Sequence, residues 1–417
     1  MSYFYPRKGH SHFCDLKVIR SFVITCSSKL RNIPDKTVHY VSLDGNHLFN
    51  LDYTVMKRII LFTLLLIASS PLFLSHGQNT NAEALIHEGV ELHDEGNFKE
   101  AIKKYNEALT ADPTSVQATY ELSLSYLALQ DYQNAFDYST RVIVSGNKQL
   151  SSGAYAVKGE ALAGMNQIDD AIKLLEEGLA ANGDEFLLHF NLALNYYKKR
   201  ENDKTLEHVK RAIDLDKSHS GAFLLNAYAL NDNGLWVQSI LSFQMFLLLE
   251  PDSKRSKSAF EEMLNLMQIK TTEEPVQRSF IQQQMVRNNP DTIPHRDKIP
   301  PLSIKEGLNR NFVYHAITTT LDSLKNSSGE KDDFTLFKTV NKEIMNVLIR
   351  ESKGVKEGVF WTFYIPFFSH ITGSGYYETF CRYISVSYFP ESLEWWQQNP
   401  DDAIDFVTWF EKGDEDK

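Results

Sequence analysis

Three kinds of side chain that can do chemistry stand out in the last quarter of the chain: one thiol, two imidazoles and a hydroxyl between two glycines. Cys381 with His315 or His370 can in principle supply a nucleophile and its base. No local motif accompanies them, and a lone Cys in an aromatic run is typical of a small buried apolar residue. Ser374 lacks the wider glycine pattern of a hydrolase elbow. Its simpler interpretation is a hinge between helices.

Metal and cofactor chemistry finds equally little support. The stretch from His10 to Cys14 superficially resembles a metal-ligand cluster, but no second ligand pair follows at a usable spacing. The chain has neither a phosphate-binding loop nor a dinucleotide fingerprint. We therefore expect no catalytic residue, no metal site and no cofactor, and a protein that is not an enzyme. The alternative is an enzyme or small-ligand binder whose site lies near the C-terminus.

A period close to 34 residues organises the chain from about Ala82 to Pro251. Five similar segments begin 34, 36, 34 and 34 residues apart, at Ala101, Ala135, Ala171, Thr205 and Ser239. A fixed period in this range is typical of a solenoid, in which each unit buries its apolar face only against its neighbours. Binding is the default function of such a surface.

Each period predicts two antiparallel helices. Leu85, Gly89 and Leu92 share one stripe of the first helix, and residues 94–97 supply a turn. The stripe of the second helix stops at Pro113 and consists of Phe98, Ala101, Tyr105 and Ala108. Small residues on these stripes let two helix backbones approach closely, and large ones fill the gap to the next hairpin.

These residues resemble the tetratricopeptide repeat, whose pattern has a large residue, Leu with Gly or Ala, a Tyr, and later Ala, an aromatic residue, Ala and Pro. The fifth unit supplies Ala227, Leu230, Gly234, Trp236, Ser239, Phe243 and Pro251. The resemblance covers about 170 of the 417 residues. Departures such as Thr205 in place of Ala indicate looser packing. The resemblance implies a right-handed superhelix of five helix-turn-helix repeats that binds a protein or peptide partner.

The repeat array is followed by three further segments. A capping helix from Lys254 to Ile269 is expected to cover the last apolar face, so that the array with its cap spans 82–269. Residues 270–301 are rich in Gln, Asn, Asp and Pro and predict a linker. Residues 302–417 predict a mostly helical C-terminal module, although Tyr383 to Phe389 alternates well enough for a strand. The expected fold class is all-α throughout.

The C-terminal module is unusually aromatic. Seventeen of the 51 residues from Phe360 to Phe410 are Phe, Trp or Tyr. These rings can form a platform for a partner, because Trp and Tyr offer rigid contact area. They can also form a small core that uses large side chains to bury enough surface. Both interpretations stay open at this point.

A secretory signal peptide is predicted at residues 56–77. A basic start at Met56 precedes an apolar run, Ile59 to Leu74, that is short for a membrane span, and small residues follow before Gln78. Residues 1–55 are then a spurious or disordered extension from a start site placed too far upstream. Alternatively they are genuine, and the apolar run is an uncleaved signal anchor. Either way the repeats lie outside the cytosol, periplasmic or secreted, with no membrane span after cleavage.

The charge of the chain limits the kinds of partner it can bind, and its cysteine content limits how its fold can be stabilised. The formal net charge of the chain is −11, and without residues 1–77 it is about −16. An acidic balance argues against nucleic acid and anionic lipid surfaces. Cys381 is the one cysteine after residue 77, so an exported chain could form no internal disulfide and must be held together by packing.

The family resemblance implies that the first helix of each repeat lines a concave groove. Transferring that register gives, repeat by repeat, the candidate partner-binding residues Ile86, Val90 and His93; Tyr120, Leu124 and Leu127; Glu160; Phe190, Asn191, Leu194 and Tyr197; and Leu224, Tyr228 and Asn231. Some relatives clamp a terminal carboxylate with Lys, Arg and Asn at these places, and that basic set is absent here. An apolar, aromatic groove suits a hydrophobic segment or helix better.

The leading hypothesis is therefore an exported scaffold or adaptor that binds a protein partner through the groove. In the alternative, the aromatic C-terminal module holds an enzymatic or small-ligand site and the repeats serve in docking. An open groove favours the first hypothesis. An enclosed pocket that unites Cys381, a His and a carboxylate favours the second.

Overall fold

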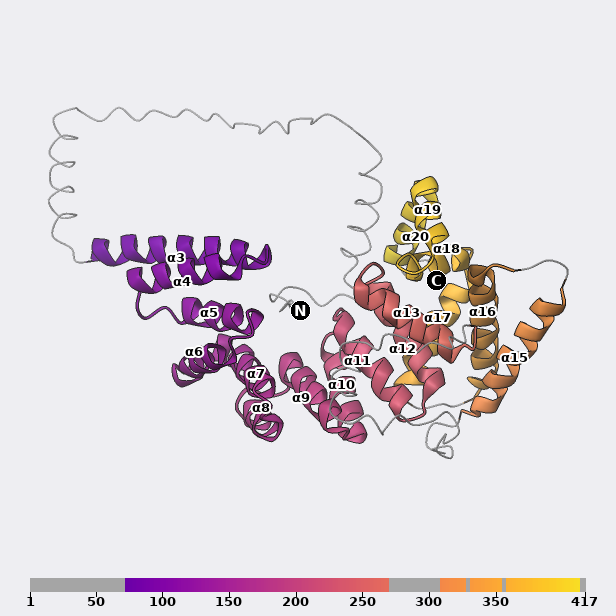
Figure 1. The fold of residues 1–417 in the computed structure, drawn as a ribbon, viewed down its shortest axis with the longest axis horizontal. Coiled ribbons are helices and arrows are strands. Elements are labelled where there is room, and N and C mark those ends of the chain that lie inside the picture. Colours follow the sequence, from indigo (N-terminus) through magenta and orange to yellow (C-terminus); the bar gives the residue numbers. More distant parts are fainter. Residues whose placement is uncertain (1–71, 270–307, 328–330, 355–357, 413–417) are drawn as a thin grey trace, which may run out of the picture. The chain divides into compact units, whose positions relative to one another are not determined.

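The computed structural model describes residues 72–269, 308–327, 331–354 and 358–412 (Figure 1). All regular elements in these ranges are helices. The described residues form two compact units, one up to Asn191 and one from Leu192 onward. The division falls within one helix, α9 (Phe186–Lys199). The predicted all-α fold is confirmed.

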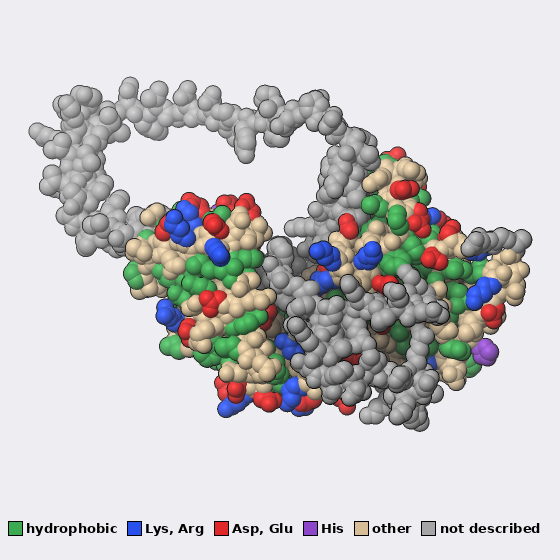
Figure 2. All heavy atoms as spheres, viewed as in Figure 1, with side chains coloured by type: hydrophobic (Ala, Val, Ile, Leu, Met, Phe, Trp, Pro, Cys, Tyr) green, Lys and Arg blue, Asp and Glu red, His purple; other side chains and the backbone are tan. Residues whose placement is uncertain are grey.

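Unit 1 is a series of helical hairpins. Its helices are α3 (Leu72–Asp94), α4 (Phe98–Ala111), α5 (Val116–Ala128), α6 (Tyr132–Val144), α7 (Lys148–Gly164), α8 (Ile168–Asn182) and the first part of α9. Each helix from α3 to α7 packs on the next one along the chain, and α5 also packs on both α3 and α7. The first helices of successive hairpins are therefore neighbours. On the face shown in Figure 2, charged side chains gather over α3–α4 and over α8, with apolar side chains between them.

A glycine permits the close approach of the two helices in the first hairpin. A side chain at Gly89 would overlap the ring of Tyr105, which is completely buried. Tyr105 also packs in a cluster with Val90 and with Leu122 of the next hairpin. One ring therefore fills the space within its own hairpin and toward the following one, as the predicted small and large stripes require.

The chain leaves the first helix of every hairpin through the same backbone conformation. Left-handed residues follow these helices at one position per period: Gly96, Gln130, Asn166, Arg200, Gly234 and Gln268, with φ of 83°, 61°, 64°, 62°, 69° and 58°. In each case the helix ends, and after the first five the chain turns back into the next helix. Only two of the six are glycine, so the sequence stripes do not reveal this position. The sixth residue follows α13 (Lys254–Leu266), so the capping helix ends as the first helix of a repeat does.

Unit 2 joins the last two repeats to the C-terminal helices. It contains the end of α9, α10 (Asn202–Leu215), α11 (Ser220–Asp232), α12 (Trp236–Leu249), α13, α15 (Arg310–Asn326), α16 (Asp333–Glu351), the π-helical turn η2 (Phe360–Tyr364), α17 (Ile365–Gly373), α18 (Tyr377–Ile384), α19 (Pro390–Gln398) and α20 (Pro400–Lys412). Helix α12 packs on α11, α13 and α18. From Val237 on, every residue of α12 is buried. The C-terminal helices thus belong to the same compact unit as the fifth repeat.

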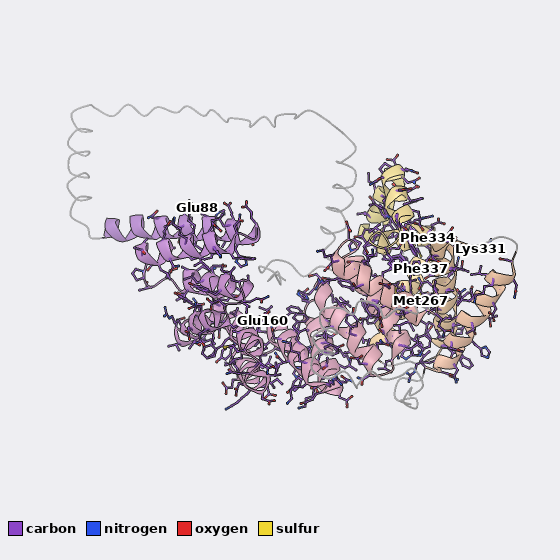
Figure 3. All side chains as sticks on the ribbon, viewed as in Figure 1. Glu88, Glu160, Met267, Lys331, Phe334 and Phe337 are labelled. Atoms are coloured by element: carbon purple, nitrogen blue, oxygen red, sulfur yellow. The ribbon has the colours of Figure 1, made fainter. Side chains whose placement is uncertain are left out.

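Aromatic and amide contacts hold this junction together. The ring of Phe260 on α13 meets Phe337 on α16, with centroids 4.9 Å apart, and Phe389 before α19 at 5.4 Å. Gln244 on α12 donates a hydrogen bond from Nε2 to Oδ1 of Asn341 on α16 at 2.8 Å. Both amides are buried. Figure 3 labels Phe337 on α16 and Met267 just after α13, where the two helices meet.

The strand considered for Tyr383 to Phe389 does not form. Helix α18 continues to Ile384, and residues 385–388 form turns before α19. The alternation of aromatic and small residues does not correspond to alternating exposure, because Ser385 and Val386 are both buried. The Ser385 hydroxyl hydrogen-bonds that of Ser392 at 2.9 Å, which joins the turn to α19. A buried serine therefore occupies a position that the sequence pattern would assign to the exposed face of a strand.

Candidate functional site

The predicted groove residues of unit 1 lie on three neighbouring helices. Ile86, Val90 and His93 belong to α3, and Tyr120, Leu124 and Leu127 to α5, whereas Glu160 lies on α7 (Figure 3). Helix α5 packs on both other helices, and we refer to these seven residues together as the first-helix face. Val90 is buried with 8% of its surface exposed, and the other six are partly exposed.

The apolar part of this face is built on the contact between α5 and α7. Tyr120, Leu124 and Leu127 pack against buried Val157 and Ala161 of α7 and keep part of their surface accessible. A side chain at Gly153 of α7 would overlap the Tyr120 hydroxyl. Burial, helped by the nearby Glu121 carboxylate, raises the pKa of Tyr120 well above its ordinary value. The phenol therefore stays protonated at neutral pH and can act as a donor at the edge of an apolar surface.

His93 ties α3 to α5. Its Nδ1 lies 2.8 Å from the Ser125 hydroxyl oxygen, and its ring packs edge-on against Phe98 with centroids 5.0 Å apart. Ser125 is buried, so this hydrogen bond satisfies a hydroxyl that would otherwise lie in the core. His93 thus positions the face as well as lining it.

The polar part of the face is acidic. Glu121 is 8% exposed and accepts a 2.6 Å hydrogen bond from the side-chain amide of Gln117, one turn earlier on α5. Glu160 adds a second carboxylate on α7. Helices α3 and α5 contain neither Lys nor Arg. Of the two lysines on α7, Lys158 stacks on the ring of Phe136, 4.5 Å from its centroid. The face therefore offers apolar contact beside carboxylates.

The predicted groove residues on α9 and α11 are mostly covered. Phe190, Asn191, Tyr197, Leu224 and Tyr228 are buried, with 5%, 5%, 2%, 7% and 3% of their surface exposed. Leu194 and Asn231 are partly exposed.

Contacts within the protein account for this burial. Phe190 stacks on Phe186 at 5.7 Å, and Tyr228 meets Phe243 edge-on at 5.3 Å. Burial, together with the nearby Asp232 carboxylate, raises the pKa of Tyr197. The sequence stripe placed Tyr197 correctly on the helix but could not show its acidic partner on the next repeat.

The possible catalytic groups are not assembled. Cys381 is completely buried on α18, and burial raises the pKa of its thiol to about 12. The polar side chains near it are those of Tyr377, Asn341, Lys338 and Glu378. His315 and His370 are exposed on other helices. A thiol that remains protonated and out of solvent has no access to substrate, so the arrangement gives no support to the thiol–imidazole alternative.

The other sequence motifs either have a structural role or lie outside the described residues. Ser374 sits in the turn between α17 and α18, and its hydroxyl donates to the Ile371 carbonyl at 2.7 Å. Among the described residues, no group of three or more His, Cys, Asp or Glu could hold a metal ion. The His10–Cys14 stretch lies outside them. So does most of the predicted signal peptide, whose last residues, 72–77, begin α3.

Comparison with known proteins identifies the repeat. Residues 72–148 and 157–220 match the tetratricopeptide repeat family. The TPR repeat-containing protein MJ1428 of Methanocaldococcus jannaschii is 26% identical over 133 residues, which are 31% of this chain and 23% of that protein. The match thus spans about a quarter of the relative's length. In the described part of the chain, no helix has both the length and the apolar character needed to span a membrane.

Two solved structures are similar over the repeats. TTC0263, a protein of Thermus thermophilus, is 19% identical, over 45% of this chain and 99% of its own, with a TM-score of 0.39. PilF of Pseudomonas aeruginosa is 17% identical, over 52% and 95%, with a TM-score of 0.40. TM-scores this low give no information about the function of this chain.

Proposed function

Because this chain is a tetratricopeptide repeat protein, we propose that it is a scaffold that binds a protein partner on the first-helix face of unit 1. The repeat fold supports a protein-interaction scaffold as such. The observation that carries the specific proposal is the partly exposed apolar surface of Tyr120, Leu124 and Leu127, at the contact of two helices, α5 and α7, that also carry the carboxylates of Glu121 and Glu160. Large side chains held in place by their own packing cost little conformational entropy when a partner binds.

The partner that fits this face is an apolar, helical segment with basic flanks. Leu124 and Leu127 are one turn apart on α5, a spacing that matches the apolar stripe of an amphipathic helix. Carboxylates beside the apolar surface favour Lys or Arg at the edges of that helix. A partner ending in a bare carboxylate would meet no Lys or Arg on α3 or α5. Because the predicted groove residues on α9 and α11 are mostly buried, the proposed binding surface covers the first three repeats rather than all five.

The binding experiment uses substitutions on two faces of one helix. Leu124→Gln combined with Leu127→Gln keeps side-chain length and removes the apolar surface, whereas Leu129→Gln is the matched control. Leu129 is 37% exposed at the end of the same helix and is not among the groove residues. Partners captured by the tagged chain in its own cells should weaken at least tenfold with the double variant and stay within twofold with the control. Equal capture by all three proteins would refute the proposal.

We also propose that the chain is exported by cleavage after Gly77. The proposal depends on the signal pattern at residues 56–77. Helix α3 runs across this position, so cleavage would leave a helix of Gln78–Asp94 that keeps every groove residue of the first repeat. The mass of the mature protein tests it, with Gln78 as the expected first residue. A mature chain that still contains Met56 and the apolar run would favour the membrane-tethered alternative.

A further inference from the structure

The aromatic residues of the C-terminal helices divide into a core and a surface. Of the seventeen between Phe360 and Phe410, ten are buried and seven are partly exposed. A small core made of large rings explains the ten. It does not explain why most of the other seven lie together, because partly exposed rings scattered at random over a surface would make few contacts with one another.

Four of the seven rings, together with His370, form a continuous surface that we call the aromatic patch: Phe367, His370, Tyr376, Trp409 and Phe410. His370 stacks on Trp409 with centroids 4.9 Å apart and planes 11° apart. Tyr376 meets the same indole at 5.1 Å, and Phe367 meets Phe410 at 5.9 Å. His370 is exposed and the other four are partly exposed.

Two helices and the turn that holds Tyr376 present the patch over a rigid floor. Phe367 and His370 lie one turn apart on α17, while Trp409 and Phe410 lie on α20. Completely buried Phe406 supports both α20 rings from below, with centroids 6.2 Å from Trp409 and 6.0 Å from Phe410. The rings are therefore fixed before any partner arrives, which lowers the entropic cost of binding.

Acidic side chains outnumber basic ones along the chain segment that carries the patch. From Gly358 to Phe410 the chain has six acidic side chains and a single basic one, Arg382. Arg382 is already engaged, 3.4 Å from Glu378 and 3.7 Å above the ring of Phe334.

Two of these acids belong to the same stripe as the indole. Asp402 and Asp405 precede Trp409 by seven and four residues on α20, so they share its side of the helix, and both are exposed. Green and red side chains adjoin at this C-terminal end of unit 2 in Figure 2.

We propose that the aromatic patch binds an arginine-rich segment of a protein partner. A guanidinium group stacks flat on aromatic rings and pairs with carboxylates through its in-plane N–H groups. The partly exposed ring of Trp409, on the same helical stripe as Asp402 and Asp405, supplies both requirements. An anionic partner would be repelled by the same carboxylates. This surface is independent of the first-helix face of unit 1, so either can fail without the other.

The test measures binding of a ten-residue peptide of alternating Arg and Gly to the full chain by isothermal titration calorimetry at low salt. Asp402→Asn combined with Asp405→Asn changes only exposed side chains and should weaken binding about fivefold. Trp409→Leu should weaken it by about the same factor. The same peptide with Lys in place of Arg should bind at least about threefold more weakly, because an ammonium group cannot stack as a plane.

Matched variants separate the patch from the acidity of the whole chain. Asp322→Asn removes an exposed carboxylate on α15, and Trp395→Leu removes a partly exposed indole that is not part of the patch and packs edge-on against Trp396. Both should stay within twofold of the wild-type affinity. Equal weakening by all variants, equal affinity for the Arg and Lys peptides, or no binding at all would overturn the proposal. So would binding of a neutral oligosaccharide that Trp409→Leu abolishes, if the Arg peptide does not bind.

Discussion

The N-cap of α11 predicts how the stability of unit 2 depends on pH. His219 precedes this helix, and its Nδ1 accepts a hydrogen bond from the Ala222 backbone N–H at 3.2 Å. Burial of the imidazole lowers its pKa to about 4, and Arg255 adds to the lowering, while Asp216 and Glu250 act in the opposite direction. A protonated Nδ1 could not accept the capping hydrogen bond, so the folded state requires the neutral ring.

The sign and size of the effect follow from this lowered pKa. An unfolded histidine takes up a proton near pH 6.5, whereas the folded one does so near pH 4. The stabilising contribution is complete above pH 6.5 and is lost as the pH falls toward 4. The full difference corresponds to about 3 kcal/mol, of which about 2 kcal/mol is lost between roughly pH 7.5 and 5. Glu250, whose pKa is lowered by its pairing with Arg255 against the effect of burial, adds to the loss only at lower pH.

The assay is urea unfolding followed by tryptophan fluorescence at the two pH values. All five tryptophans lie in unit 2, so the signal reports on that unit. His219→Asn supplies the control, because Asn is a good N-cap and does not titrate. The free energy of unfolding of the wild type should fall by about 2 kcal/mol more than that of the variant between roughly pH 7.5 and 5. If both proteins lose the same amount, the argument about His219 is wrong.

Three further predictions concern packing. Gln130 has the left-handed φ of 61° after α5, so Gln130→Gly should raise the stability of unit 1 by about 0.5–1 kcal/mol, measured by thermal circular dichroism; a decrease would contradict the helix-end assignment. Gln244→Leu should cost about 1–3 kcal/mol by leaving the buried Asn341 amide unpaired, and Asn341→Leu in addition should restore most of it. The Cys381 thiol should react with a disulfide reagent only at the rate of unfolding; rapid labelling of the native chain would show that it is accessible.

Local periodicity was sufficient to predict the repeats. The 34-residue spacing and stripes such as Gly89 with Tyr105 place each helix on its neighbour, because every repeat contacts mainly the adjacent ones. The regular left-handed residue after each first helix was not visible in the same way. Four of its six positions hold Gln, Asn or Arg. The packing of the hairpin forces these residues into the left-handed conformation, which their residue types alone do not predict.

The candidate site was predictable only in part, because sequence gives a register but not what covers it. The same register that leaves Leu124 partly exposed leaves Tyr228 buried against Phe243. Long-range contacts made the difference in unit 2, where Gln244 and Asn341 pair across 97 residues of chain. The C-terminal module likewise had no periodicity to indicate that it would pack on α12. The sequence did not predict which of its rings are buried and which form the partly exposed aromatic patch.

Site-specific photocrosslinking on α5 tests the central claim most directly. A benzophenone amino acid is placed at Leu124 on the first-helix face, or at Leu129 at the end of the same helix, in the full chain expressed in its own cells. If the first-helix face binds the partner, position 124 should give a discrete crosslinked protein whose crosslinked peptide is apolar with basic flanks, and position 129 should not. Crosslinks of equal yield from both positions, or from position 129 alone, would contradict the account.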